Sequence, residues 1–421
     1  MSGKASPIDG VVFHTIAWTW AFYAIGALYL VGPMLGWALG GLAVLSLYLG
    51  PAIRADLRAT GAPPPVVGSW IAGMAIMLIA LWAGHINWDM GLGQTIKSTI
   101  GWAKGWALMA LFPLAGAVLP VGRERLIRAH CVLALVTLLL CPLLVAAPYA
   151  GAPGQLFTSP LKAVGGPGPE YFSVYLYTLD PASWTPRWQF YLPWSPFAGM
   201  MGVVLALFAR EEPDWRWRWI GITAALAMIL LSKSRMSLVA LPVCLFLPAL
   251  TPLVLRTWAW AAGAALLASM AVWGGWASRV LQDAITGFKQ ARADSTRVRE
   301  TLQRIAEDRW ASDAQWFGHG TVERGPHLVE YMMIGSHHTW FGLLFVKGAV
   351  GFAALALPMA WQFILAFADA AKGRRGRLPM GLMLALLILS MGENIEIEVY
   401  MLWPALLLLG IHAREIAGAK N

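Results

Sequence analysis

Long apolar runs separated by short polar segments cover most of the chain. A helix needs roughly 20 apolar residues to cross a bilayer core, and runs of about that length lie near residues 11–32, 34–52, 67–86, 100–121, 129–148, 195–210, 219–233, 236–254, 257–276, 338–368, 379–392 and 398–413. The pattern predicts an all-α integral membrane protein with about twelve transmembrane helices, forming a single polytopic domain over residues 1–421. The first run is long enough to be a retained span rather than a signal peptide.

The basic residues between these runs indicate an orientation. If the N-terminus is cytoplasmic, every short basic loop falls on the cytoplasmic side, as the positive-inside rule demands. These residues are Arg54, Arg58, Arg123, Arg125, Arg128, Arg210, Arg216, Arg218, Arg256 and Lys372–Arg377. Both termini are then cytoplasmic. Two long polar segments, 151–193 and 278–336, face the opposite side, and loops of that length are exempt from the rule.

Composition supports the membrane assignment. Hydrophobic residues make up 58% of the chain and charged residues 13%, which is more apolar than a soluble domain. The net charge of +9 can serve membrane topology as well as an anionic partner. We therefore expect contacts with membrane lipids and no nucleic-acid partner.

The second polar segment carries basic residues that topology does not require. They are Arg279, Lys289, Arg292, Arg297, Arg299, Arg304, Arg309 and Arg324. Part of the segment, 293–310, predicts a surface helix whose apolar face consists of Val298, Leu302, Ile305 and Ala306. Single arginines on such a helix often contact only water or lipid headgroups. As a cluster they favour an anion site.

The stretch "LSKSRMSL" ends the seventh run, which leads to the outer face. It brings Lys233, Ser234 and Arg235 to the interface. Each cation alone can be an interfacial anchor. Two cations bracketed by hydroxyls instead favour a tight turn that presents hydrogen-bond donors, and a guanidinium group is well matched to phosphate.

The stretch "YMMIGSHHTWFGLLFVKGAVGF" places His337 and His338 at the start of the tenth run. Unpaired N–H groups and the dipole at a helix N-terminus attract anions, so this helix start and the arginines favour the same ligand. A structural hydrogen bond is the alternative for either histidine. Gly348 and Gly351 share one helix face and predict the close approach of another helix.

The stretch "GENIEIE" places Glu393, Glu396 and Glu398 between the last two runs, on the outer side. They either orient His337 or an arginine, or form a solvated turn. No Asp-x-Asp pair occurs in the chain, and a zinc site built from His319, His327, His337 and His338 has irregular spacing. We expect no metal and no cofactor.

Together these motifs resemble the O-antigen ligase and Wzy-type polymerase superfamily of bacterial envelope glycosyltransferases. The ligases carry His, a small polar residue, nine residues and Gly-x-x-Gly, a spacing that selects His337 here, with His338 in the polar position. The stretch "SKSR" looks like the family's Ser-Arg turn. "STRVRETLQRIAEDRWASDAQWFGHGT" is similar to its loop helix ending in Phe-Gly-x-Gly. The resemblance covers roughly residues 195–413.

The resemblance implies a GT-C-like enzyme of the bacterial inner membrane. It would move O-antigen from undecaprenyl diphosphate to a hydroxyl group of lipid A–core oligosaccharide, at the periplasmic face, in lipopolysaccharide biosynthesis. We expect His337 to be the catalytic base. The residues expected to hold the diphosphate are Arg235, Arg297, Arg299 and Lys233, and those expected to support them are His338, Ser234, Glu393, Glu396 and Glu398. A Wzy-type polymerase remains the alternative, and a twelve-span exporter is the rival from another class.

Overall fold

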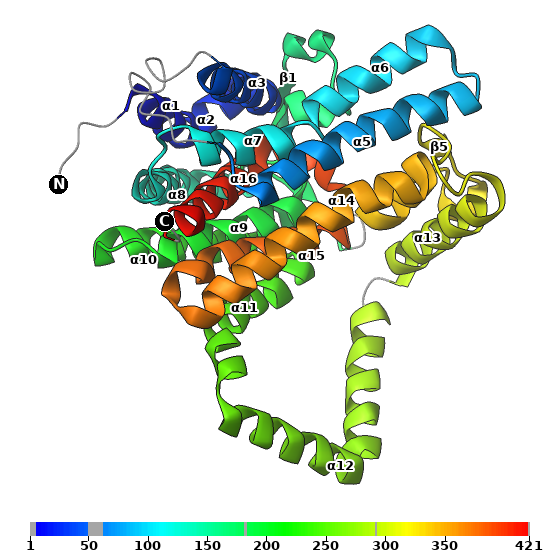
Figure 1. The fold of residues 1–421 in the computed structure, drawn as a ribbon. Helices are drawn as coiled ribbons and strands as arrows, with labels where there is room; N and C mark the ends of the chain where they lie inside the picture. The colour runs from blue at the N-terminus through cyan, green and yellow to red at the C-terminus, as the bar shows by residue number, and fades with distance from the viewer. Residues whose placement is uncertain (1–5, 49–61, 181–182, 291–292, 420–421) are drawn as a thin grey trace.

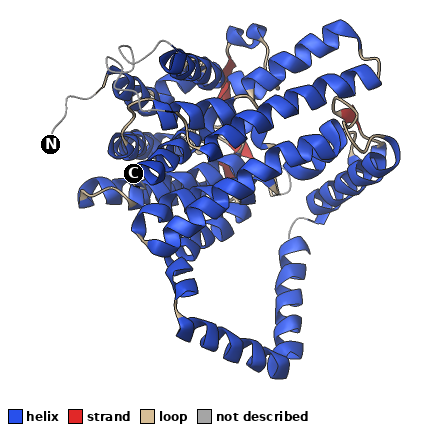
Figure 2. Ribbon diagram, in the orientation of Figure 1, coloured by secondary structure: helices blue, strands red, loops and turns tan. Residues whose placement is uncertain are grey.

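The computed structural model of the chain describes residues 6–48, 62–180, 183–290 and 293–419. Helices dominate it, and short strands occur only in the two long polar segments (Figures 1 and 2). The helices are α1 (Pro7–Ala17), α2 (Thr19–Ala24), α3 (Leu28–Tyr48), α5 (Pro65–Asn87), α6 (Gly91–Lys104), α7 (Leu108–Val118), α8 (Arg123–Ala146), α9 (Ser195–Arg210), α10 (Trp215–Leu231), α11 (Arg235–Leu250), α12 (Thr257–Gln290), α13 (Ala293–Asp313), α14 (Thr339–Lys372), α15 (Arg377–Ser390) and α16 (Ile395–Gly418). Antiparallel pairing joins β1 (Gln155–Thr158) to β2 (Ser173–Tyr175), β3 (Thr178–Leu179) to β4 (Pro186–Arg187), and β5 (Glu323–Arg324) to β6 (Met333–Ile334).

Length and composition identify six of the described helices as able to cross a membrane. They are α3, α5, α8, α11 with the 3-10 turn that follows it, α14 and α16. This confirms the prediction of an all-α membrane-embedded protein, while the count of twelve spans stays a prediction. Several predicted runs coincide closely with helices, and the run 195–210 has the same bounds as α9.

The boundary between the first two predicted spans is wrong. The apolar pattern breaks at Pro33, but Pro33 lies inside α3, and the chain turns instead between Ala24 and Leu28. Gly26 makes this turn with φ of +65°, a conformation that glycine adopts without strain. A Cβ at Gly26 would lie 2.5 Å from the Cβ of Ser159. Proline bends a membrane helix without having to end it, so Pro33 was a poor boundary signal.

The predicted span at 100–121 is also wrong, because the chain divides there into two helices. α6 ends at Lys104 and α7 begins at Leu108. No residue of α6 is buried, whereas α7 is almost entirely buried and packs against α16. A continuous apolar run therefore joined two helices that lie in different surroundings.

A helix runs through the predicted start of the second polar segment. α12 continues through 278 to Gln290, so the predicted loop starts inside a helix. Figure 1 shows α12 leading away from the other helices and α13 lying beside the start of α14. Several basic residues used as sequence evidence, Arg54, Arg58, Arg292 and the side chain of Lys289, lie outside the described residues.

The surface helix predicted at 293–310 is confirmed as α13. Its apolar face packs on the β5–β6 hairpin region and on the first turns of α14. The buried residues of this small core are Val298, Leu302, Ala306, Val329, Ile334 and Phe345, with Ile305 partly buried against them. Burial of this face fixes which side of α13 carries the arginines.

α16 lies at the centre of the helix assembly. In its most apolar window 89% of the residues are buried inside the protein, compared with 22% for α11. α11 therefore presents most of its apolar surface outward, as a lipid-facing helix does, and α16 is surrounded by other helices. The start of α1 and the end of α16 lie at one end of the molecule, and α13 lies at the other (Figure 1).

Candidate functional site

The two adjacent histidines take different positions at the start of α14. His338 is the N-cap: its Nδ1 accepts a hydrogen bond from the Phe341 N–H at 3.4 Å, and its ring packs edge-on against Phe341. His337 is only partly buried and has φ of +61°. A non-glycine residue in this left-handed region is uncommon and strained by about 1 kcal/mol or more. Such strain is often found at functional sites.

The histidine turn is fastened to the turn between α15 and α16. The buried Thr339 hydroxyl donates to the Glu393 carbonyl at 2.7 Å and accepts from the Ile395 N–H at 3.1 Å. The Trp340 indole donates to Ser390 Oγ at 2.9 Å. These bonds hold residues of "GENIEIE" beside His337, although some 55 residues separate the two turns in the sequence.

The charge of Arg299 in α13 influences the protonation of one residue in each turn, His337 and Glu393. Burial lowers the pKa of His337 below its ordinary value, and the positive charge of Arg299 lowers it further. Burial raises the pKa of Glu393 to about 7, and the same arginine opposes that rise. Burial also lowers the pKa of His338, to about 4. The site thus combines a neutral imidazole, a guanidinium and a buried carboxyl group.

The three glutamates of "GENIEIE" are all at least partly buried. Glu393 is buried and interacts electrostatically with Arg299 and with the carboxyl group of Glu398, and Glu396 lines a cavity. Glu398 is fully buried, and neither of its carboxylate oxygens has a hydrogen-bond partner among the described residues. None of the three is fully exposed, so the solvated-turn interpretation does not describe this structure.

The Ser-Arg turn adjoins the same region through the start of α11. Ser234 is the N-cap of α11 and accepts from the Ser237 N–H, and Arg235 is the first residue of the helix. A Cβ on Gly392 would lie 3.1 Å from the sulfur of Met236, so this turn touches the one that carries Glu393. Lys233 points to the first polar segment, where its Nζ donates to Thr185 at 2.8 Å.

Arg297 lies on a different side of α13 from Arg299, because residues two apart on a helix do not face each other. It is exposed, and its Nη1 donates to the Leu328 carbonyl at 3.4 Å. The structure therefore brings His337, Arg299 and Glu393 together, with Arg235 near them. The roles predicted for Arg297 and Lys233 in diphosphate binding stay predictions.

Gly348 serves the second polar segment rather than a neighbouring helix. Its φ of +63° and ψ of −165° interrupt α14, in a region that only glycine occupies readily. A Cβ there would collide with the backbone of Trp316 and Phe317. The predicted close approach is thus real, but the partner is a loop. This differs from the expectation of helix packing.

The loop replaces the helical hydrogen bonds that α14 loses at this break. The Phe345 and Val346 carbonyls accept from the N–H groups of His319 (2.7 Å) and Gly320 (2.9 Å). In return, the Ala349 and Val350 N–H groups donate to the Gln315 (2.8 Å) and Trp316 (3.1 Å) carbonyls. The "FGHGT" segment is therefore built into the helix. His319 also stacks on Phe345 and on Trp88, and the Trp88 indole donates to Gly318.

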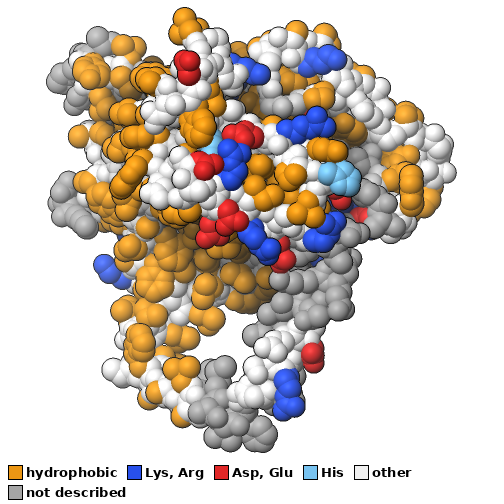
Figure 3. Space-filling view, turned by 90° about the vertical axis from the view of Figure 1, so that its right-hand side faces the viewer, with side chains coloured by type: hydrophobic (Ala, Val, Ile, Leu, Met, Phe, Trp, Pro, Cys, Tyr) orange, Lys and Arg blue, Asp and Glu red, His pale blue; other side chains and the backbone are white. Residues whose placement is uncertain are grey.

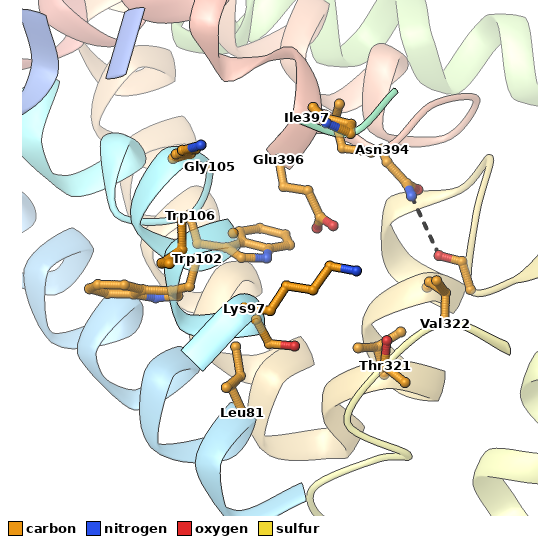
Figure 4. Close-up of a pocket in the computed structure, with 18 of the residues that line it drawn as sticks. Leu81, Lys97, Trp102, Gly105, Trp106, Thr321, Val322, Asn394, Glu396 and Ile397 are labelled. Carbon is orange, nitrogen blue, oxygen red and sulfur yellow. Dashed lines mark hydrogen bonds between the residues drawn. The ribbon is translucent and has the colours of Figure 1, made fainter. Parts of the chain in front are cut away.

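A cavity of about 470 Å³ adjoins the histidine turn (Figure 4). Segments that line it come from α6 and the turn that follows it, from Tyr29 of α3 and Leu81 of α5, from both long polar segments, and from the starts of α14 and α16. Thr339 and Asn394 belong both to its wall and to the contacts around the histidine turn, where Asn394 Nδ2 donates to Gly335. The two polar segments therefore meet at one place.

Lys347 of α14 lines this cavity and was missed from the sequence. It is only 5% exposed. A usable signal was present, because Lys347 is the one charged residue in the apolar run 338–368, and charges inside membrane helices are usually functional.

Charged and imidazole side chains gather at the end of the molecule that carries α13. Figure 3 views this end, where Lys, Arg, Asp, Glu and His side chains lie among apolar ones. Within the described ranges, no three His, Cys, Asp or Glu side chains are grouped so that they could share a metal ion.

No protein-family model matches the chain, and no curated protein is similar to it at a significant level.

Proposed function

We propose that the chain is a membrane glycosyltransferase that ligates O-antigen from undecaprenyl diphosphate to a hydroxyl group of lipid A–core oligosaccharide. In this proposal it is a GT-C-like protein with about twelve spans in the bacterial inner membrane, its termini are cytoplasmic, and its two long polar segments are periplasmic. The observation that carries the proposal is the group formed by His337, Arg299 and Glu393, at the helix start that the ligase-like spacing selects.

The reaction assigns each group a simple task. The acceptor oxygen forms a bond to the anomeric carbon of the glycan, and the bond from that carbon to the phosphate oxygen breaks. The electron pair leaves with the diphosphate, whose growing charge is held by fixed cations, namely Arg299 and Arg235 with Arg297 and Lys233. The acceptor's proton passes to the neutral imidazole of His337.

Burial supports the choice of His337 as the base. Because its pKa is lowered, the ring stays neutral at a lower pH than that of a free histidine. His338 is engaged as a helix cap through Nδ1, which favours a supporting role. Glu393 is placed to hold Arg299 in position, since the carboxyl group and the guanidinium interact electrostatically.

Arginine and lysine, rather than a divalent ion, neutralise the diphosphate in this proposal. We therefore expect transfer to persist after exhaustive EDTA treatment, measured as the rate of glycan transfer before and after dialysis. Loss of transfer that magnesium or manganese restores would contradict this assignment.

The decisive experiment offers purified protein a lipid-linked O-antigen together with one of two acceptors. A product on lipid A–core oligosaccharide supports the ligase, and a longer lipid-linked chain supports the Wzy-type polymerase. Flux of the lipid-linked glycan across vesicle membranes without bond formation would instead support an exporter. His337→Ala protein is the control for transfer that does not depend on the site.

A further inference from the structure

The cavity beside the histidine turn has polar groups that the proposed chemistry does not use. Lys347 and Glu396 both line it, from α14 and α16. Their opposite charges attract each other, but among the described residues no hydrogen bond or ion pair joins them. A buried ammonium group in a membrane helix is costly unless a partner compensates it. A polar ligand in the cavity would give both charges the hydrogen-bond partners that they lack within the protein.

The rest of the wall fits a hydroxyl-rich ligand. Trp102 and Trp106 contribute indole rings, the kind of surface on which sugar rings commonly pack through their C–H faces. Backbone at the glycines 165, 166, 320 and 335 also lines the cavity and leaves room for a ring to approach. A volume of about 470 Å³ lies within the range of small-molecule sites, roughly 300–1,000 Å³.

Two more lysines stand at this cavity. Figure 4 shows the Lys97 side chain extending from α6 across it, in the same region as the Glu396 side chain. Lys104 is already engaged, because its Nζ donates to the Val164 and Gly165 carbonyls at 3.3 and 2.9 Å. This contact holds the first polar segment beside the cavity. Of the three lysines in the lining, Lys97 and Lys347 can therefore bind a ligand.

We propose that this cavity is a saccharide-binding subsite, in which the hydroxyl groups of one sugar unit bridge Lys347 and Glu396. The ammonium donates to sugar oxygens and the carboxylate accepts from sugar hydroxyls, so each charge gains the partner that the protein alone does not supply. The inference rests on the proposed glycosyl transfer, since it places a sugar next to the turn that carries His337. The sugar belongs either to the acceptor or to the glycan of the donor, and these share the same chemistry.

The first test separates the two sources by steady-state kinetics. Lys347→Met keeps the length of the side chain while removing its charge, and Glu396→Gln keeps its shape. Each should raise the KM for one substrate by about tenfold or more, as expected for a lost hydrogen bond to a charged group, and leave the KM for the other unchanged. A raised acceptor KM assigns the cavity to the acceptor, and a raised donor KM assigns it to the donor glycan. Unchanged KM values for both would overturn the proposal.

The matched control is Lys372→Met, which removes an exposed lysine at the far end of the same helix. It should leave both KM values unchanged. Size-exclusion profiles and thermal unfolding of all three variants show whether they fold. If Lys347→Met does not fold, Glu396→Gln alone decides.

The second test does not depend on catalysis. Saturation-transfer NMR of the intact protein in detergent uses two lipid-free probes, core oligosaccharide and the glycan released from the donor. We expect one probe to bind and Glu396→Gln to weaken its binding by about tenfold. Saccharide binding without any transfer would reject the proposed function and keep the subsite. Transfer without cavity-dependent binding, or phospholipid retained there in place of sugar, would reject the subsite and keep the function.

Discussion

Two neighbouring glutamates from one turn serve two regions that are built differently. Glu393 belongs to the group of His337, Arg299 and Glu393, which we call the filled region. There Glu393 interacts electrostatically with Arg299, and the charge of Arg299 lowers the pKa of His337. Glu396 lines the cavity, which Lys347 also lines. Where charges interact within the protein, they can set the protonation of a base. Where opposite charges face an open space, they can hold a ligand. In our proposals, the first region therefore carries out the chemistry and the second recognises the saccharide.

Replacing the base should separate the two regions most strongly. His337→Ala should lower turnover by roughly a hundred- to ten-thousand-fold, the usual contribution of general-base catalysis, while saccharide binding at the cavity is unchanged. Transfer rates and donor affinity measured in matched detergent preparations check this. His338→Ala, which removes a helix cap, should cost less. Near-normal turnover in His337→Ala would refute the base assignment, and lost donor binding would make His337 a diphosphate ligand.

A second, smaller effect should come from replacing an arginine that is proposed to hold the diphosphate. Arg235→Lys keeps the charge but removes the planar fork that binds phosphate through two hydrogen bonds. We expect donor kcat/KM to fall by about 10- to 100-fold, the value of a hydrogen bond to a charged group. The comparison variant is Arg297→Lys, at an exposed arginine that contacts the Leu328 carbonyl. If Arg235→Lys keeps the donor kcat/KM of the unchanged protein, charge rather than fork geometry holds the diphosphate at this position.

Much of the helical architecture followed from hydropathy, because burial in lipid or protein requires long apolar runs. The bounds of α9 and the apolar face of α13 were predicted correctly. The division into α6 and α7 was not, because hydropathy does not distinguish a helix on the surface from one packed against α16. The break at Gly26 depends on contact with Ser159, which is distant in sequence.

The site was predictable in part for the same reason. His337, Arg299 and Glu393 each belong to a local motif, so the sequence could nominate them. Their proximity depends on Thr339 and on the fold of the second polar segment. The cavity could not be predicted, because its wall comes from segments far apart in the chain. Two of its charged residues left a trace in the sequence: Glu396 in "GENIEIE", and Lys347 as the one charged residue of the run 338–368.

The break in α14 supports both regions at once. Gly348→Ala should destabilise the protein by about 1–3 kcal/mol, because alanine does not tolerate this backbone conformation. Both transfer and saccharide binding should weaken together, since the displaced loop borders each region. Gly41→Ala, where a Cβ would meet nothing within 4 Å, is the control. Thermal unfolding, transfer rates and saccharide binding of both variants check this prediction. If Gly348→Ala weakens transfer alone or saccharide binding alone, the loop supports only one of the two regions.

The smallest expected effect is a shift in the pH dependence of kcat, which involves His337 and Arg299 and not the cavity. Since the pKa of His337 is held below its ordinary value, activity should fall only as pH drops below that of a typical histidine titration. Arg299→Gln removes a positive charge and should raise this pKa, moving the acid limb of the kcat profile to higher pH. Saccharide binding at the cavity should keep its pH dependence. An acid limb that does not move, or moves to lower pH, would contradict the electrostatic link.

The hydrogen bonds between the "FGHGT" segment and α14 also decide which parts can move. Withdrawing that segment together with Gln315 and Trp316 would leave the carbonyls of Phe345 and Val346 and the N–H groups of Ala349 and Val350 without their present partners. Each stranded group away from water costs several kcal/mol. We therefore expect this segment to stay in place. If the proposed transfer requires a gating motion, we expect it in the parts of the first polar segment that contact Lys104 and Lys233, because hydrogen bonds from single ammonium groups hold them there.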